Sequence, residues 1–158
     1  MRRLALTLAL CLPSAALACP GDLLLSCPIG KKRLELCLDD ATLTYSFGPA
    51  GRPELVLPTP IRDAAYQPWS GVGRAMWDAV SFQNKDITYE VWTSFDRLDE
   101  TAVWEGGVNV LRGDALQASL TCAKGSVAGD LYPVMEAKLA AGQCWNRDAH
   151  HWQDQPCP

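Results

Sequence analysis

Apolar and polar residues alternate along most of the chain, with the two-residue period of half-buried β-strands. The segments with this period are residues 32–38, 43–47, 54–57, 76–82, 87–95, 108–110 and 116–122. Turn residues such as Asn84-Lys85-Asp86 and Arg112-Gly113-Asp114 separate neighbouring segments, so adjacent segments are expected to form hairpins. About seven short strands in this order predict a mainly β fold, an antiparallel barrel or sandwich.

The period changes near the C-terminal end, where the pattern predicts one α-helix. Asp130 is placed to cap a helix that begins near Tyr132, and Gly142 is placed to end it. The residues expected on its buried face are Val134, Ala137, Leu139 and Ala140. Because Cys144 follows the helix at once, we expect a disulfide to hold the helix against the strands. The polar tail after Asn146 is expected to be ordered only by Cys157.

Residues 59–73 show no sustained period and are predicted to form a long ordered loop. Long loops inside compact domains often carry function, so this loop is the predicted site. Pro68 stiffens the approach and the glycines allow a tight backbone path, which lets the loop enter a partner's acidic cleft at low entropic cost. The predicted binding residues are Trp69, Ser70, Gly71, Gly73 and Arg74. The alternative is a structural loop whose Trp69 fills the barrel mouth.

The first 18 residues have the pattern of a cleavable signal peptide. Arg2 and Arg3 precede an apolar run, and Ala16-Leu17-Ala18 has the small-x-small pattern of a cleavage site. The run is too short to cross a bilayer, so no transmembrane segment is predicted. We therefore expect one domain, residues 19–158, that is periplasmic or secreted. A lipid anchor on Cys19 is the alternative, although position 16 carries Ala where lipoprotein signals usually carry Leu.

Six cysteines follow the signal peptide, and an even number in an exported chain predicts three disulfides. They are Cys19, Cys27, Cys37, Cys122, Cys144 and Cys157. The sequence leaves about 15 pairings open. Because the early group and the late group each hold an odd number of cysteines, at least one bridge is expected to join the two groups and stabilise the fold.

Charge and motifs limit the possible functions. The net charge of −4 is unsuited to binding nucleic acid and suits cationic partners. No hydrolase, P-loop or dinucleotide-binding motif occurs in the sequence. The two histidines, His150 and His151, are adjacent in the tail and lack the spacing of a metal site. We therefore predict no catalytic residue, cofactor or metal, and favour a binding function over an enzymatic one.

The Ser70-Gly71 motif and the disulfide-bonded β architecture between Cys27 and Cys122 resemble the small exported lysozyme inhibitors of Gram-negative bacteria. Members of that family are antiparallel β-barrels that insert a Ser-Gly loop into the enzyme's cleft. The resemblance implies a cationic lysozyme as the partner. The chain departs from the family's pattern at Arg74, where members carry Tyr or Phe, and in its C-terminal helix. It looks more closely like uncharacterised proteobacterial exported proteins with a Cys-x9-Cys start, a Gly-Pro turn and a Pro-Trp-x-Gly-x-Gly-Arg loop, a likeness that implies no activity.

These patterns together predict an exported binding or inhibitor protein that contacts a protein partner through residues 69–74. Two alternatives stay open. One is a structural or assembly component of the cell envelope. The other is a carbohydrate-active enzyme, for which Trp69, Trp92 and Trp104 are the expected surface aromatics while Trp77 and Trp145 are expected to be buried.

Overall fold

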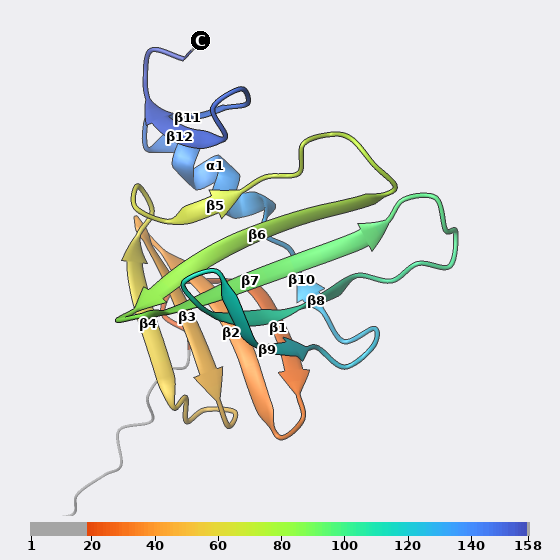
Figure 1. Ribbon diagram of the computed structural model, residues 1–158. Helices are drawn as coiled ribbons and strands as arrows, with labels where there is room; N and C mark the ends of the chain where they lie inside the picture. Colours follow the sequence, from red (N-terminus) through yellow and green to blue (C-terminus); the bar gives the residue numbers. More distant parts are fainter. Residues whose placement is uncertain (1–18, 158) are drawn as a thin grey trace, which may run out of the picture.

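The computed structural model describes residues 19–157, so the predicted signal peptide lies outside the described residues. The described chain forms twelve β-strands and one α-helix, arranged as two five-stranded antiparallel sheets and a separate two-stranded hairpin (Figure 1). The mainly β prediction is confirmed, and the strand count exceeds the seven that were expected. No helix within these residues has the length and apolar character needed to cross a membrane.

The first sheet contains the first predicted hairpin. In spatial order its strands are β10 (Ala128–Gly129), β1 (Asp22–Ile29), β2 (Lys32–Asp39), β3 (Thr42–Gly48) and β4 (Leu55–Pro60). Leu34 and Leu36 of β2 point into the core, as the alternation predicted. Pro58 and Pro60 lie on β4, at the edge of the sheet, where a residue without a backbone N–H is tolerated.

The second sheet contains the other two predicted hairpins. Its strands, in spatial order, are β5 (Ala65–Gln67), β6 (Ala75–Asn84), β7 (Ile87–Asp96), β8 (Glu105–Arg112) and β9 (Ala115–Thr121). Strand β5 lies inside the segment that was predicted to be one long loop, so that prediction is wrong in part. Residues 68–74 form the remaining irregular stretch between β5 and β6.

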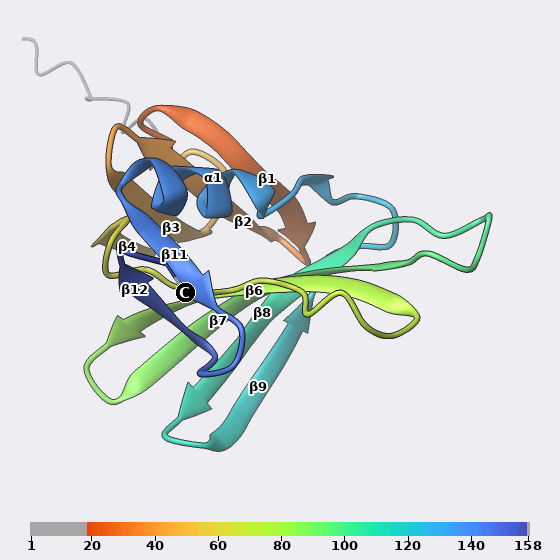
Figure 2. The same ribbon diagram turned by 90° about the horizontal axis from the view of Figure 1, so that it is seen from above.

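The two sheets pack on each other around one core and do not join into a closed barrel. Tyr45 of the first sheet stacks on Phe82 and Tyr89 of the second, with ring centroids 5.4 and 5.6 Å apart. Of the two predicted architectures, barrel or sandwich, the closed barrel is therefore excluded. The prolines of β4 remove backbone donors from one edge that closure would have to pair. Figure 2 shows the second sheet crossing the first, with β9 extending beyond it.

Three disulfides form among the six predicted cysteines. Cys27 of β1 pairs with Cys122, which follows β9, and both are buried in the core. This bridge joins the early and late cysteine groups, as expected. By the chain-entropy argument a bridge across 95 residues stabilises the fold by about 5 kcal/mol.

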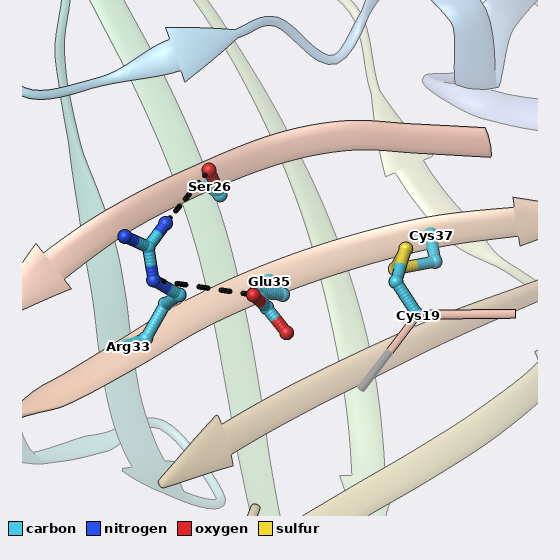
Figure 3. Close-up of a disulfide and its surroundings, with 5 residues drawn as sticks. All are labelled: Cys19, Ser26, Arg33, Glu35 and Cys37. Atoms are coloured by element: carbon cyan, nitrogen blue, oxygen red, sulfur yellow. Dashed lines mark hydrogen bonds and ion pairs between the residues drawn. A yellow bond between two sulfur atoms is a disulfide. The ribbon is translucent and has the colours of Figure 1, made fainter. Parts of the chain in front are cut away.

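A second disulfide joins Cys19 to Cys37 of β2, on the face of the first sheet opposite the core (Figure 3). The same face carries Ser26 and Glu35, which flank Arg33. The Arg33 guanidinium donates a hydrogen bond to the Ser26 hydroxyl over 3.3 Å and lies 4.0 Å from the Glu35 carboxylate. This disulfide uses the Cys19 sulfur that a lipid anchor would require.

The remaining elements form a C-terminal unit of α1 (Tyr132–Ala140), β11 (Gln143–Asn146) and β12 (His151–Asp154). The predicted helix is confirmed, and its Tyr132 N–H is bonded to the Asp130 carboxylate over 2.8 Å. The tail is not a loose end, because β11 and β12 pair as a hairpin. Cys144–Cys157 closes this hairpin and does not tie the helix to the sheets, contrary to expectation.

Candidate functional site: an aromatic cleft

A cleft of about 850 Å³ lies between the second sheet and the C-terminal unit. Aromatic side chains dominate its lining, which includes four of the chain's six tryptophans: Trp69, Trp77, Trp104 and Trp145. A concave, mostly apolar site of this size with a few polar groups is typical of small-molecule binding. The cleft is therefore the candidate functional site.

Asp78 of β6 organises the sheet side of the cleft. Its Oδ1 accepts a hydrogen bond from the Tyr66 hydroxyl over 3.0 Å and another from the Trp69 backbone N–H over 2.9 Å. The side chain of Asp78 shares the inner face of β6 with Val80, two residues further along. The carboxylate thus fixes both β5 and the start of the loop that follows it.

Tyr66 is buried beneath the cleft and donates to Asp78 as a neutral phenol. Burial raises the pKa of Tyr66 well above its ordinary value, and the negative charge of Asp78 raises that pKa further. The phenol therefore stays protonated across the physiological pH range and keeps its hydrogen bond to the carboxylate.

Helix α1 forms the opposite wall with Tyr132, Met135 and Leu139. These residues are three and four positions apart, so they share one helix face. Leu139 is 44% exposed, Tyr132 is 56% exposed and Ala140 is also exposed, so the prediction that Leu139 and Ala140 are buried is wrong. Val134 and Ala137 pack against the core as predicted, and the same buried face also carries Lys138, which was not predicted there.

Lys138 explains this orientation of the helix. Its side chain is fully buried, and its Nζ donates to the carbonyl oxygens of Ile61 at 2.9 Å, Arg62 at 3.2 Å and Ala64 at 2.8 Å. An ammonium group has three N–H donors, so three carbonyls satisfy it. Nζ also lies 5.1 Å from the centre of the Trp152 ring. Burial lowers the pKa of Lys138 to about 8. Lys138 thereby anchors the cleft wall to the turn between the two sheets.

The β11–β12 hairpin completes the cleft with Trp145, Arg147 and His150. Trp145 pairs across the hairpin with Trp152, with ring centroids 5.8 Å apart. The indole N–H of Trp152 donates to the backbone oxygen of Tyr66 over 2.7 Å, which attaches the hairpin to β5. Arg147, His150 and Trp152 thus come from the segment that was predicted to be a polar tail, whereas Trp145 directly precedes it.

Two carboxylates that line the cleft, Asp78 and Asp130, take part in no ion pair with the residues that the structure describes. The Oδ1 of Asp130 accepts the Tyr132 N–H, and the Oδ1 of Asp78 accepts two donors. Across the same residues, no group of three or more His, Cys, Asp and Glu side chains is placed to hold a metal ion.

Only two of the five residues predicted to bind a partner line the cleft. Trp69 and Ser70 line the cleft. Gly71 and Gly73 lie further out on the loop, with positive φ angles of 86° and 104° that suit glycine. Arg74 also lies outside the cleft lining, where its Nε bonds the Asp96 carboxylate over 2.6 Å.

A second loop, residues 97–104 between β7 and β8, braces the first. The Arg97 guanidinium lies over the Trp69 ring, 5.3 Å from its centre, and the Arg97 N–H donates to the Arg74 oxygen over 3.3 Å. The indole N–H of Trp69 donates to the Val72 oxygen over 2.9 Å. Residues 69–74 and 97–104, here named the loop pair, project together beyond the sheets in both views (Figure 1 and Figure 2).

Sequence reasoning missed several cleft residues. Trp77 and Trp145 were expected to be buried, yet both are half-buried and line the cleft. Asp78 sits at an inward position of a predicted strand, and an acidic residue at such a position was a usable signal. Trp92 is half-buried with a buried indole nitrogen, so it is no free surface aromatic. Comparison of the chain with family models, curated proteins and solved structures found no match.

Proposed function

We propose that the protein is an exported binding protein whose ligand occupies the aromatic cleft. The observation that supports this most directly is the gathering of Trp69, Trp77, Trp104 and Trp145 around one concavity. Partly exposed indole rings are costly to leave in water, and their flat faces contact an apolar ligand over a large area.

The cleft walls are held in place without a ligand. Asp78 bonds β5 and the Trp69 backbone, Lys138 anchors the helix, and Trp152 bonds the hairpin to Tyr66. Such preorganisation reduces the entropy lost on binding. The geometry therefore favours recognition of a small ligand by a formed site.

The test is a fragment screen of the oxidised protein, followed through the indole N–H resonances of its tryptophans. Ligands should shift the resonances of the four cleft tryptophans and leave Trp92 unchanged. Leu139→Glu, which places a charge on the cleft rim, should weaken binding of an apolar ligand at least about tenfold. Leu116→Glu is the matched control, because Leu116 is an exposed leucine on β9 that does not line the cleft.

Two results would overturn this proposal. One is a screen in which no ligand perturbs the cleft tryptophans. The other is a ligand whose affinity is reduced equally by Leu139→Glu and Leu116→Glu.

We propose the loop pair as a second, protein-binding surface. Three apolar side chains are exposed on it: Val72 at 77%, Leu98 at 67% and Val103 at 42%. The Arg74–Asp96 ion pair and the contact of Arg97 with Trp69 brace the two loops, so they can insert into a partner at low entropic cost. The resemblance to lysozyme inhibitors and the net charge of −4 make a cationic lysozyme the first partner to try.

This second function predicts stoichiometric loss of lysozyme activity on titration with the oxidised protein. Val72→Asp should weaken the inhibition, whereas Leu116→Asp, on an exposed strand outside the loop pair, should not. Full activity of every cationic lysozyme at a large excess of the protein would rule it out.

A further inference from the structure

Asp78 carries a negative charge that the described part of the protein does not neutralise. Its Oδ1 is occupied by the Tyr66 hydroxyl and the Trp69 N–H, and residues 19–157 contribute no hydrogen bond to its Oδ2. No Lys, Arg or His of those residues lies within ion-pair distance of it. The carboxylate is thus fixed in position and has one oxygen left to accept a donor from a ligand.

The aromatic lining favours the same sign of ligand charge. The face of an indole ring carries negative electrostatic potential, and a cation over such a face is attracted to it. Trp77 and Trp104 line the cleft together with Asp78, whereas the Trp69 ring already has the Arg97 guanidinium over it. Asp130 adds a second carboxylate that forms no ion pair within residues 19–157. An anionic group placed beside Asp78 would be repelled by its carboxylate.

We propose that the ligand of the cleft is a small organic cation, in which an ammonium group lies beside Asp78 and an apolar body contacts the tryptophans. This inference rests on the proposed function, since it assigns a chemical class to the ligand of the same site. The ammonium group supplies the cationic partner that Asp78 and Asp130 do not have among residues 19–157.

Two cationic side chains in the cleft favour the opposite ligand charge, an anion. Arg147 and His150 line the hairpin wall and would attract an anion. Both are exposed, so water screens their charge, whereas Asp78 is half-buried and its charge acts over a medium of lower dielectric constant. The carboxylates therefore dominate the choice of ligand charge.

The experiment compares three ligands that share a phenyl ring and differ in the head group: phenethylamine, 2-phenylethanol and 3-phenylpropionate. Dissociation constants are measured at pH 7 from the tryptophan indole resonances of the oxidised protein. Phenethylamine should bind at least about tenfold more tightly than 2-phenylethanol, and 3-phenylpropionate should bind most weakly.

Asp78→Asn tests the role of the carboxylate. The amide oxygen of Asn can still accept from Tyr66 and Trp69, so the variant removes the charge and keeps both hydrogen bonds. It should abolish the preference for phenethylamine over 2-phenylethanol, so that the two ligands bind with similar dissociation constants. Asp130→Asn, which keeps an acceptor for the Tyr132 N–H, should reduce the preference in the same direction. Asp114→Asn, in the exposed β8–β9 turn, is the matched control and should change nothing.

The outcomes separate this inference from the proposed function. If 2-phenylethanol or 3-phenylpropionate binds as tightly as phenethylamine, the cleft is a binding site and the cation assignment is wrong. The assignment is also wrong if Asp78→Asn and Asp130→Asn both leave the preference intact. Absence of binding by all three ligands contradicts the proposed function together with the inference.

Discussion

The indole nitrogen of Trp152 donates a 2.7 Å hydrogen bond to the backbone oxygen of Tyr66, two residues that are 86 positions apart in the sequence. Tyr66 in turn donates to Asp78, and the Trp152 ring lies under the Lys138 ammonium. One chain of contacts therefore links the sheet, helix and hairpin walls of the cleft.

Trp152→Phe removes this hydrogen bond and keeps most of the ring. We expect the free energy of unfolding to fall by about 1 kcal/mol, because the Tyr66 oxygen loses its donor. Urea denaturation measures this change. Tyr132→Phe, which alters an exposed ring of the cleft rim, is the control and should leave stability unchanged.

Replacing Lys138 should be the most destabilising change in the helix. Lys138→Met leaves three carbonyl oxygens without their shared donor, at an expected loss of about 2 to 4 kcal/mol in urea denaturation. Glu136→Gln, on the exposed side of the same helix, should change stability by less than about 0.5 kcal/mol. Equal stability of the Lys138→Met and Glu136→Gln proteins would contradict the anchoring role.

The lowered pKa of Lys138 predicts a specific pH dependence. Between pH 8 and the usual pKa of about 10.4, the unfolded state binds more protons than the folded state, so the contribution of Lys138 to stability rises with pH. Above about pH 10 the raised pKa values of Tyr45 and Tyr66 reverse the trend, because those phenols ionise only on unfolding. Urea denaturation between pH 7.5 and 10 should show a rise for wild type relative to Lys138→Met. Parallel plots of unfolding free energy against pH for the two proteins would refute the predicted contribution of Lys138.

The disulfides should differ in their effects. By loop length, removal of Cys27–Cys122 costs about 5 kcal/mol and removal of Cys144–Cys157 about 3 kcal/mol. The first replacement is expected to lower the melting temperature of the whole domain. The second should also weaken ligand binding, because it loosens the wall that carries Trp145. Calorimetry and the fragment assay, applied to double-alanine variants, distinguish the two effects.

Regular alternation of apolar and polar residues made the central hairpins predictable. Strands without this alternation were not predicted. Strand β1 was missed because Leu23, Leu24 and Leu25 form an unbroken apolar run and the register shifts between Leu23 and Leu25. A bulge of this kind removes the two-residue period on which the prediction depends. The sequence left barrel and sandwich both open because strand spacing carries no information on whether two sheet edges pair.

The helix was predicted in the right place, and Val134 and Ala137 face inward as expected, but Lys138 is buried while Leu139 and Ala140 are exposed. Pattern reasoning places lysine in solvent, whereas three carbonyls at the turn after β4 bind the Lys138 ammonium. That turn is far from Lys138 in the sequence, so no local sequence pattern indicates that Lys138 is buried against it. The same limit applies to the cleft, where Trp69 and Ser70 were predicted but their neighbours Trp145 and Tyr132 come from another part of the chain.

The β11–β12 hairpin is closed by its own disulfide and lies outside both sheets. Residues in its turn, such as Arg147 and His150, face the cleft without contributing to the core cluster. Substitutions there can change what the cleft accepts while the sheets keep their stability. The turn of the hairpin, residues 147–150, is thus an exchangeable specificity element, suited to being redesigned for a different ligand while Trp152 keeps the hairpin attached to the scaffold.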